Sequence, residues 1–350
     1  MTVLRLVLGM LLGLSSITSA RAQAKPDEQR VVIAIFGGLL GKAVRENVEL
    51  YTKAHGIQAV FVESASADIL AKIRAQRGAP QFDLALLNDQ TFAVAKAFGL
   101  IEKLDLAEVP NARAMRPGLL AANLYGAPYE VNPVGYIYRR DKFSAAGVPV
   151  PDTWRAVLDA RLAGQVITYG FSSFYTPLQM VGLELSAGKT ARDGDEIWSF
   201  MAAMKANRTL VISAPGQAEE LARSGEAWVY PGSAERALLL RNQGVDIGFA
   251  PTADALMSLT SYMVPIRHAP HPVNAQRVLN WILGPTVQTR MARDGAVVPV
   301  NADVALTPEL MERMGFDPAS DIPAFRVLDV EALNDQFGEW SERFDKTMGR

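Results

Sequence analysis

Short β-branched runs alternate with segments of helical period along the first third of the chain. Residues 29–35 read QRVVIAI, which predicts a strand, and the glycine pair at 37–38 predicts a turn after it. Apolar residues then recur at helical spacing between residues 44 and 51. The same order continues with predicted strands at 58–62 and 82–87 and predicted helices at 68–77 and from about residue 90. Alternation of this kind predicts a mainly parallel sheet with helices on both faces.

A long extended stretch separates this region from a second α/β region. Residues 129–138 read YEVNPVGYIY, with little helical period, and a run of this length can cross between two lobes. A helix is predicted to open after Pro151, with Asp152 or Thr153 as its cap. Further strands are predicted at 165–169, 209–213, 227–230, 247–250 and 261–266.

The pattern predicts an α/β protein with two lobes joined by several strand crossings rather than by one tether. We assign residues 27–133 plus 252–300 to lobe 1, and residues 134–251 plus 301–350 to lobe 2. Ligands of such sheets bind beyond the carboxyl ends of the strands, so the loops after the strands are the first places to look for a site.

The N-terminus has the order of a secretory signal. Arg5 precedes an apolar run, and Ala20-Arg21-Ala22 forms an A-x-A cleavage motif, which predicts a signal peptide over residues 1–22. The apolar run is about half the ~20 residues that a membrane-spanning helix needs. Cleavage before Gln23 leaves 33 Lys and Arg (35 minus Arg5 and Arg21) against 37 Asp and Glu, a net charge of −4. With no cysteine for a lipid anchor, we expect a freely diffusing protein in a Gram-negative periplasm.

Composition removes several classes of function. The 350 residues carry 35 Lys and Arg against 37 Asp and Glu, so no global charge favours nucleic acid. The absence of cysteine excludes disulfides, cysteine-ligated metals and a cysteine nucleophile, and only three histidines remain. We expect neither a cofactor nor a metal site.

Motifs of catalysis are incomplete. Residues 36–42, FGGLLGK, lack the first glycine and the final hydroxyl of a phosphate-binding loop. Ser186 and Lys189 have the S-x-x-K spacing of acyl-enzymes, but the partner motifs of that class are missing. His268 and His271 stand in a Pro-rich segment, which we interpret as a solvated loop. No nucleophile with its base emerges, so the sequence does not predict an enzyme.

Aromatic and hydroxyl residues gather at the predicted strand ends. Each alone is more often a turn cap or a core residue, but a binding site needs apolar walls and a few polar groups, and together they supply both. The candidate ligand-binding residues are Phe36, Gly37, Ser64, Ser66, Asn88, Asp89, Tyr129, Glu130, Phe171, Ser172, Ser173, Tyr175, Tyr230, Ser233 and Thr252. The hydroxyls, with helix-start amides, suit an anionic group. Phe36, Tyr129, Phe171, Phe174 and Tyr230 would pack an organic body.

Short motifs follow one another in a specific order and spacing along nearly the whole mature sequence. They are the FGG turn at 36–38, FDLA at 82–85, the G-x-P-Y and G-x-x-Y motifs at 126–129 and 135–138, PDTW at 151–154, LDARLAGQV at 158–166, GEA at 225–227, PHPVNA at 270–275, WILGPTVQ at 281–288 and VPVN at 298–301. By these motifs the chain resembles the periplasmic solute-binding proteins of ABC importers, in the branch of the polyamine, ferric-iron, thiamine and aminoethylphosphonate binders.

The resemblance implies a type II periplasmic binding protein. In this fold each lobe is a mixed, mainly parallel sheet flanked by helices, and the lobes close on a solute. The closed form then docks on a permease in the inner membrane. By this resemblance we expect a monomer that binds no nucleic acid.

The solute is inferred from departures within the family. Polyamine binders carry an acid and an aromatic residue where Thr260 and Ser258 stand here, and residues 166–176 contain no acid. Asp89 and Glu130 are the candidates left for an amine. Ferric-iron binders use adjacent tyrosines, whereas Tyr175 is isolated from Tyr169 in the sequence. We expect a small polar or anionic organic solute, with a single amine held by Asp89 or Glu130. Polyamine and ferric iron remain alternatives, as do an enzyme or a sensor on the same scaffold.

Overall fold

The fold is described from a computed structural model. It describes residues 29–117, 119, 124–171, 173–192, 194–319, 325–328, 330–333 and 335–349. The predicted signal peptide and the candidate Ser172 lie outside the described residues.

The N-terminal strands form the parallel sheet that the sequence predicted. β1 (Arg30–Ile35) pairs in parallel with both β2 (Gln58–Glu63) and β3 (Leu84–Asn88). The strands are rich in β-branched and aliphatic residues, and the residues of β1 after Arg30 are buried because helices cover the sheet. The covering helices are α1 (Gly38–Ala54), α2 (Ser66–Ala75), α3 (Asp89–Ala97), α9 (Pro272–Ile282) and α10 (Pro285–Gly295), beside a short 3-10 helix, η2 (Pro110–Ala114).

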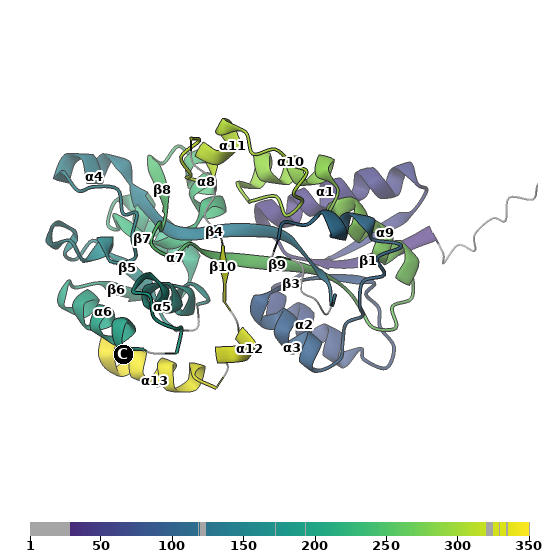
Figure 1. The fold of residues 1–350 in the computed structure, drawn as a ribbon, viewed down its shortest axis with the longest axis horizontal. Helices are drawn as coiled ribbons and strands as arrows, with labels where there is room; N and C mark the ends of the chain where they lie inside the picture. The colour runs from purple at the N-terminus through teal and green to yellow at the C-terminus, as the bar shows by residue number, and fades with distance from the viewer. Residues whose placement is uncertain are drawn as a thin grey trace, which may run out of the picture.

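Two long strands connect the lobes (Figure 1). β9 (Met257–Pro265) is antiparallel to β3 and also to the first part of β4 (Ala127–Arg139). The later part of β4 pairs with β7 (Val229–Ser233) and β8 (Ile247–Pro251) in the other lobe. The extended stretch predicted from sequence is therefore the strand that crosses between the lobes. At Gly135 an added Cβ would lie 2.1 Å from the Ala250 carbonyl oxygen, so only glycine permits this close strand approach.

The second lobe surrounds the far half of β4. A small parallel pair, β5 (Ile167–Tyr169) with β6 (Leu210–Ile212), lies beside it. Its helices are α4 (Arg140–Ala146), α5 (Tyr175–Ser186), α6 (Asp195–Ala206), α7 (Pro215–Ser224) and α8 (Ala234–Asn242).

The prediction of a helix directly after Pro151 was wrong. The segment instead forms two short 3-10 helices, η3 (Ala156–Leu158) and η4 (Ala160–Leu162). The buried Trp154 explains the difference, because its indole N–H donates to the Ala255 carbonyl at 3.0 Å and its backbone N–H donates to Asp254 at 3.3 Å. These tertiary bonds hold the chain where a regular helix would begin.

The C-terminal region contacts both lobes. Leu310 and Met311 of α11 (Pro308–Arg313) pack in the same core as β1 and α1. β10 (Arg326–Val327) then pairs with β9, and α12 (Val330–Leu333) contacts α3. The last helix, α13 (Phe337–Met348), packs against α6 in the second lobe. The lobe boundaries inferred from sequence stay a prediction, and the packing of α11 favours moving that helix to lobe 1.

Candidate binding cleft

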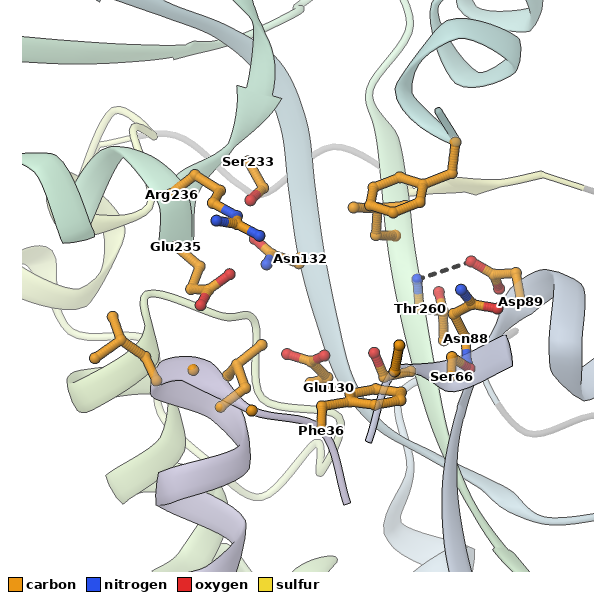
Figure 2. Close-up of a pocket in the computed structure, with 18 of the residues that line it drawn as sticks. Phe36, Ser66, Asn88, Asp89, Glu130, Asn132, Ser233, Glu235, Arg236 and Thr260 are labelled. Atoms are coloured by element: carbon orange, nitrogen blue, oxygen red, sulfur yellow. Dashed lines mark hydrogen bonds between the residues drawn. The ribbon is translucent and has the colours of Figure 1, made fainter. Parts of the chain in front are cut away.

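A cavity of about 830 Å³ lies between the lobes, over the strands that connect them. Its first wall is built from the carboxyl ends of β1, β2 and β3 and the helix starts that follow. Its second wall comes from α5 and α8, and β4 and β9 supply its floor (Figure 2). The lining residues are Phe36, Gly37, Gly38, Leu39, Leu40, Lys42, Glu63, Ser64, Ala65, Ser66, Asn88, Asp89, Gln90, Glu130, Asn132, Phe174, Tyr175, Leu178, Ser233, Glu235, Arg236, Leu239, Leu259, Thr260, Ser261 and Leu328.

Among the described residues, the helices that begin at this cavity are α1, α2, α3, α5 and α8. Local sequence places these starts. At Gly41, an added Cβ would lie 1.9 Å from the Phe36 carbonyl oxygen, so glycine lets α1 start tightly against the end of β1. At α3, Asn88 is the N-cap, and its Oδ1 accepts from the Thr91 backbone N–H at 3.0 Å. Helix N-termini carry partial positive charge, which favours a negative group in the cavity.

Many of the candidates predicted from sequence come together here. Those that line the cavity are Phe36, Gly37, Ser64, Ser66, Asn88, Asp89, Glu130, Tyr175 and Ser233. Their hydroxyls already have partners: Ser64 accepts from Lys72 at 3.0 Å, and the Ser66 hydroxyl lies 2.6 Å from that of Thr91. A role in binding stays a prediction for each of them.

Other candidates do not line the cavity. Tyr129 stands at a register shift of β4 between Pro128 and Glu130, and it is buried in the core of the first lobe, whereas Glu130 lines the cavity. Tyr230 is buried in the core of the second lobe, where Phe171 packs against Phe337 and Phe344 of α13. Thr252 donates to the Ala255 carbonyl at 2.9 Å, and the buried Ser173 hydroxyl lies 3.4 Å from the Tyr175 backbone nitrogen.

Sequence inspection missed an important pair on α8. Glu235 and Arg236 line the second wall in the first turn after β7, where they face the cavity (Figure 2). Ser64 and Asn88 were predicted because they lie directly after strands. Extending that search by one helical turn beyond each strand would have found Glu235 and Arg236 as well. Glu63 also lines the cavity, so the cleft holds more acids than the sequence predicted.

Arg236 is held by a buried carboxylate. Its Nη1 donates to Glu219 Oε1 at 2.9 Å, and the Glu219 side chain on α7 is only 11 % exposed. A guanidinium has five N–H donors, so one bond to Glu219 orients the group and leaves donors for a ligand.

Three carboxyl groups of the cavity have pKa values raised by burial. Burial raises the pKa of Glu130 to about 8, and it raises the pKa of Asp89 to about 7 although the Thr260 backbone N–H, 3.0 Å away, opposes the shift. The pKa of Glu235 is also raised by burial. Burial thus makes ionisation of each group less favourable, and a cation beside the group would favour its charged form.

Three polar atoms of the cavity floor are buried without a hydrogen-bond partner. They are Glu130 Oε2, Asn132 Oδ1 and Thr260 Oγ1. A buried polar atom without a partner costs stability, so atoms that are unpaired together at a cavity favour a polar ligand as the missing partner.

The tyrosines of the second lobe are closer than the sequence suggested. Although Tyr169 and Tyr175 are not adjacent in the sequence, their rings stack with centroids 5.4 Å apart. Tyr169 is buried away from the cavity, and burial raises its pKa well above the ordinary value and that of Tyr175 to about 12. Because Tyr169 does not line the cavity, the two tyrosines do not present a pair of phenol groups to it. Within the described residues, no cluster of His, Asp and Glu has the form of a metal site.

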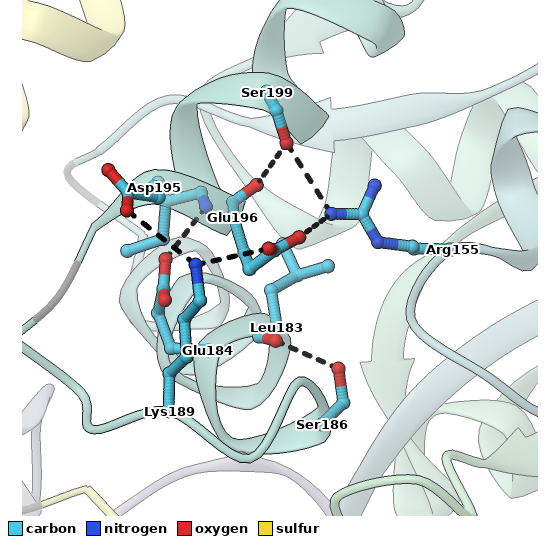
Figure 3. A network of polar contacts seen from close by, with 9 residues as sticks. Arg155, Leu183, Glu184, Ser186, Lys189, Asp195, Glu196 and Ser199 are labelled. Carbon is cyan, nitrogen blue, oxygen red and sulfur yellow. Dashed lines mark hydrogen bonds and ion pairs between the residues drawn. The ribbon is translucent and has the colours of Figure 1, made fainter.

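Ser186 and Lys189, the two residues of the S-x-x-K motif, form local polar contacts and not a catalytic pair. The Ser186 hydroxyl donates to the Leu183 carbonyl at 2.8 Å, while the Lys189 ammonium pairs with Glu196 at 3.2 Å and Asp195 at 3.6 Å (Figure 3). Serine and lysine therefore bind separate partners.

His271 is not the solvated loop residue that we expected. Its Nδ1 lies 2.9 Å from Asp83 Oδ2, and its backbone N–H donates to Asp83 Oδ1 at 2.7 Å. Asp83 is fully buried and also accepts from the Val32 backbone N–H, so this pair anchors the start of α9 to the sheet.

A model of the bacterial extracellular solute-binding proteins matches residues 46–316, which is most of the chain. The protein belongs to this family. The match confirms the resemblance to the solute-binding receptors of ABC transporters. Proteins of this family are extracellular solute-binding proteins, and this chain is one of them.

Individual relatives agree with this assignment. A Salmonella typhi periplasmic protein named for 2-aminoethylphosphonate binding is 23% identical over 273 residues, 75% of each chain. Two solved structures share the fold at 19% identity, each covering 91% of this chain and 99% of the other. They are an extracellular solute-binding protein from Bordetella parapertussis, with a TM-score of 0.76, and an ABC transporter protein from Clostridium perfringens, with a TM-score of 0.75. The two-lobe type II fold is thereby confirmed.

The location of this solute-binding protein follows from its family, which is extracellular or periplasmic. In the part of the chain that the structure describes, no helix has the length and apolar character needed to cross a membrane.

Proposed function

We propose that this receptor captures a small organic solute with an anionic group in the cavity between its lobes. The observation that carries the proposal is the second wall, where the Arg236 guanidinium is oriented toward the cavity by Glu219. Ser233 and the helix starts of the first wall add polar groups, and Phe36, Phe174 and Leu259 give apolar surface for an organic body.

The same proposal includes the form in which the receptor works. It is a monomer, released into the periplasm by cleavage before Gln23, that binds no nucleic acid, has no catalytic activity and passes its solute to an ABC permease. Native mass spectrometry of protein purified from the periplasm tests the first two points. A chain that begins at Gln23 and has the mass of one copy is the expected result, and an intact N-terminus or a dimer would contradict it.

Thermal melting with candidate solutes tests the ligand. The relatives named for 2-aminoethylphosphonate make that compound the first probe, beside ethylphosphonate, ethanesulfonate, butyrate, putrescine and spermidine. We expect a stabilising shift with at least one phosphonate, sulfonate or carboxylate, because binding to the folded state raises its stability. A response to putrescine and spermidine alone would contradict the proposal.

A variant locates the anionic group. Arg236→Gln removes the cation and keeps a hydrogen-bonding side chain, so it should weaken binding of every anionic probe by about tenfold or more. Lys42→Gln is the matched control, because Lys42 also lines the cavity but is mostly exposed and lies 3.6 Å from Glu46. Equal losses in both variants would remove the assignment to Arg236.

A further inference from the structure

We propose that the floor of the cavity at Glu130 seats an ammonium group of the solute, so that the solute is a zwitterion whose anionic group lies toward Arg236. This inference rests on the proposed function, because it adds a second charged end to the same ligand. It also chooses between Asp89 and Glu130, which the sequence left open.

The first support is the set of unpaired atoms on the floor. Glu130 is 3 % exposed and its Oε2 has no hydrogen-bond partner. Asn132 stands two residues further along β4 and therefore on the same face, and its Oδ1 is also unpaired. Thr260, on the neighbouring strand β9, has an unpaired hydroxyl. All three atoms accept hydrogen bonds, and an ammonium group offers three N–H donors.

The second support is charge. Glu130 lies on the floor between Glu235 on the second wall and Asp89 on the first wall (Figure 2). Both neighbours disfavour its ionisation, in addition to the burial that raises the pKa of Glu130. A cation at this position would meet carboxylates from three elements, β4, α3 and α8, and would offset the cost of ionising Glu130.

The other acids of the cavity are less suited as the seat. Asp89 accepts from the Thr260 backbone N–H and also hydrogen-bonds the Tyr262 side chain, whereas Glu130 bonds to Ser261 and keeps Oε2 unpaired. The Glu63 side chain is 58 % exposed and lies 3.4 Å from Arg45. Glu130 combines full burial with a free oxygen, so an ammonium group gains most there.

Arg236 decides between a zwitterion and a dication. A polyamine that placed one ammonium at Glu130 would bring its other charge toward a wall that carries a guanidinium, which is unfavourable. A molecule with opposite charges at its two ends satisfies both sites.

Isothermal titration calorimetry with matched probes tests the seat. 2-Aminoethylphosphonate and ethylphosphonate differ by the amine alone. They are titrated into the wild type, Glu130→Gln and the control Glu63→Gln, which removes an exposed carboxylate of the same cavity. Because hydrogen bonds to charged groups are worth about 1.5–3 kcal/mol, the wild type should bind the amino probe about 10- to 100-fold more tightly. Glu130→Gln should bind both probes with the affinity that the wild type has for ethylphosphonate, and Glu63→Gln should behave as the wild type.

Other outcomes would contradict the ammonium site at Glu130. Equal wild-type affinities for both probes would remove the ammonium site and leave an anion receptor, so the proposed function would stand. Loss of the amine preference in Glu63→Gln but not in Glu130→Gln would move the site to the cavity mouth. Binding of putrescine or spermidine without either phosphonate would overturn the zwitterion and the proposed function together. Thermal melts of the free variants verify folding, and Glu130→Gln should melt no lower than the wild type.

Discussion

Replacement of Glu130 by glutamine should stabilise the free receptor, and increasingly so as the pH rises. Glutamine keeps the shape and two polar atoms of the side chain but removes its ionisation. In the wild type, burial raises the pKa of Glu130 from 4.5 to about 8. The unfolded chain therefore releases this proton several pH units before the folded protein does.

The sign and size follow from proton linkage. A carboxyl whose pKa is raised on folding contributes its full stability below pH 4.5 and loses it as the pH rises to about 8. Each pH unit in this window costs about 1.4 kcal/mol. The free energy of unfolding of the wild type is therefore lower than at pH 4 by about 3 kcal/mol at pH 7 and by about 5 kcal/mol at pH 9. Asp89 on α3, Glu235 on α8 and the neighbouring Tyr129 interact electrostatically with Glu130, and they are common to both proteins.

Thermal melts of the two free proteins at pH 4, 7 and 9 measure this difference. At about 2 °C per kcal/mol for a chain of this size, Glu130→Gln should melt about 6 °C higher at pH 7, about 10 °C higher at pH 9 and within 1–2 °C of the wild type at pH 4. The control Glu63→Gln should show no such trend, because the Glu63 side chain is exposed. A difference independent of pH, or one that shrinks as the pH rises, would refute the reasoning.

Two further predictions separate orientation from packing. Glu219→Gln should weaken binding of ethylphosphonate by about threefold to tenfold, because it weakens the bond that orients Arg236. The control Glu220→Gln changes an exposed residue of the same helix and should leave the affinity unchanged. Equal affinities of the two variants in a titration would contradict the positioning role of Glu219. Tyr129→Ala should lower the free energy of unfolding, measured by urea unfolding, by about 3–5 kcal/mol, because it removes a large side chain from the core. A variant with unchanged stability that no longer binds the solute would instead place Tyr129 in the binding site.

Much of the first lobe was predictable because its signals are local. The β-branched runs and the glycines after β1 specify strand, turn and helix within a few residues, and β1, β2 and β3 appear close to the predicted positions. Parallel strands bring their carboxyl ends to one edge, so Phe36, Ser64 and Asn88 share a cavity although they are far apart in sequence.

The second lobe was less predictable because its signals depend on distant contacts. Trp154 bonds to residues about a hundred positions away, and those bonds replace the predicted helix by short 3-10 turns. Tyr169 and Tyr175 flank a turn between a strand and a helix, and this fold stacks their rings. Sequence spacing does not reveal either contact.

The sequence alone determined the class of this protein and the strand ends that form its cleft, since hydrophobic period and turn residues act over short distances. Tertiary structure decided which side chains reach the cavity. One step along β4 separates Tyr129 in the core from Glu130 on the cavity floor, and only the pairing of β4 with β9 defines which face is which. The charge of the site was decided in the same way, because Glu235 and Arg236 join Asp89 and Glu130 only when the two lobes are brought together over the connecting strands.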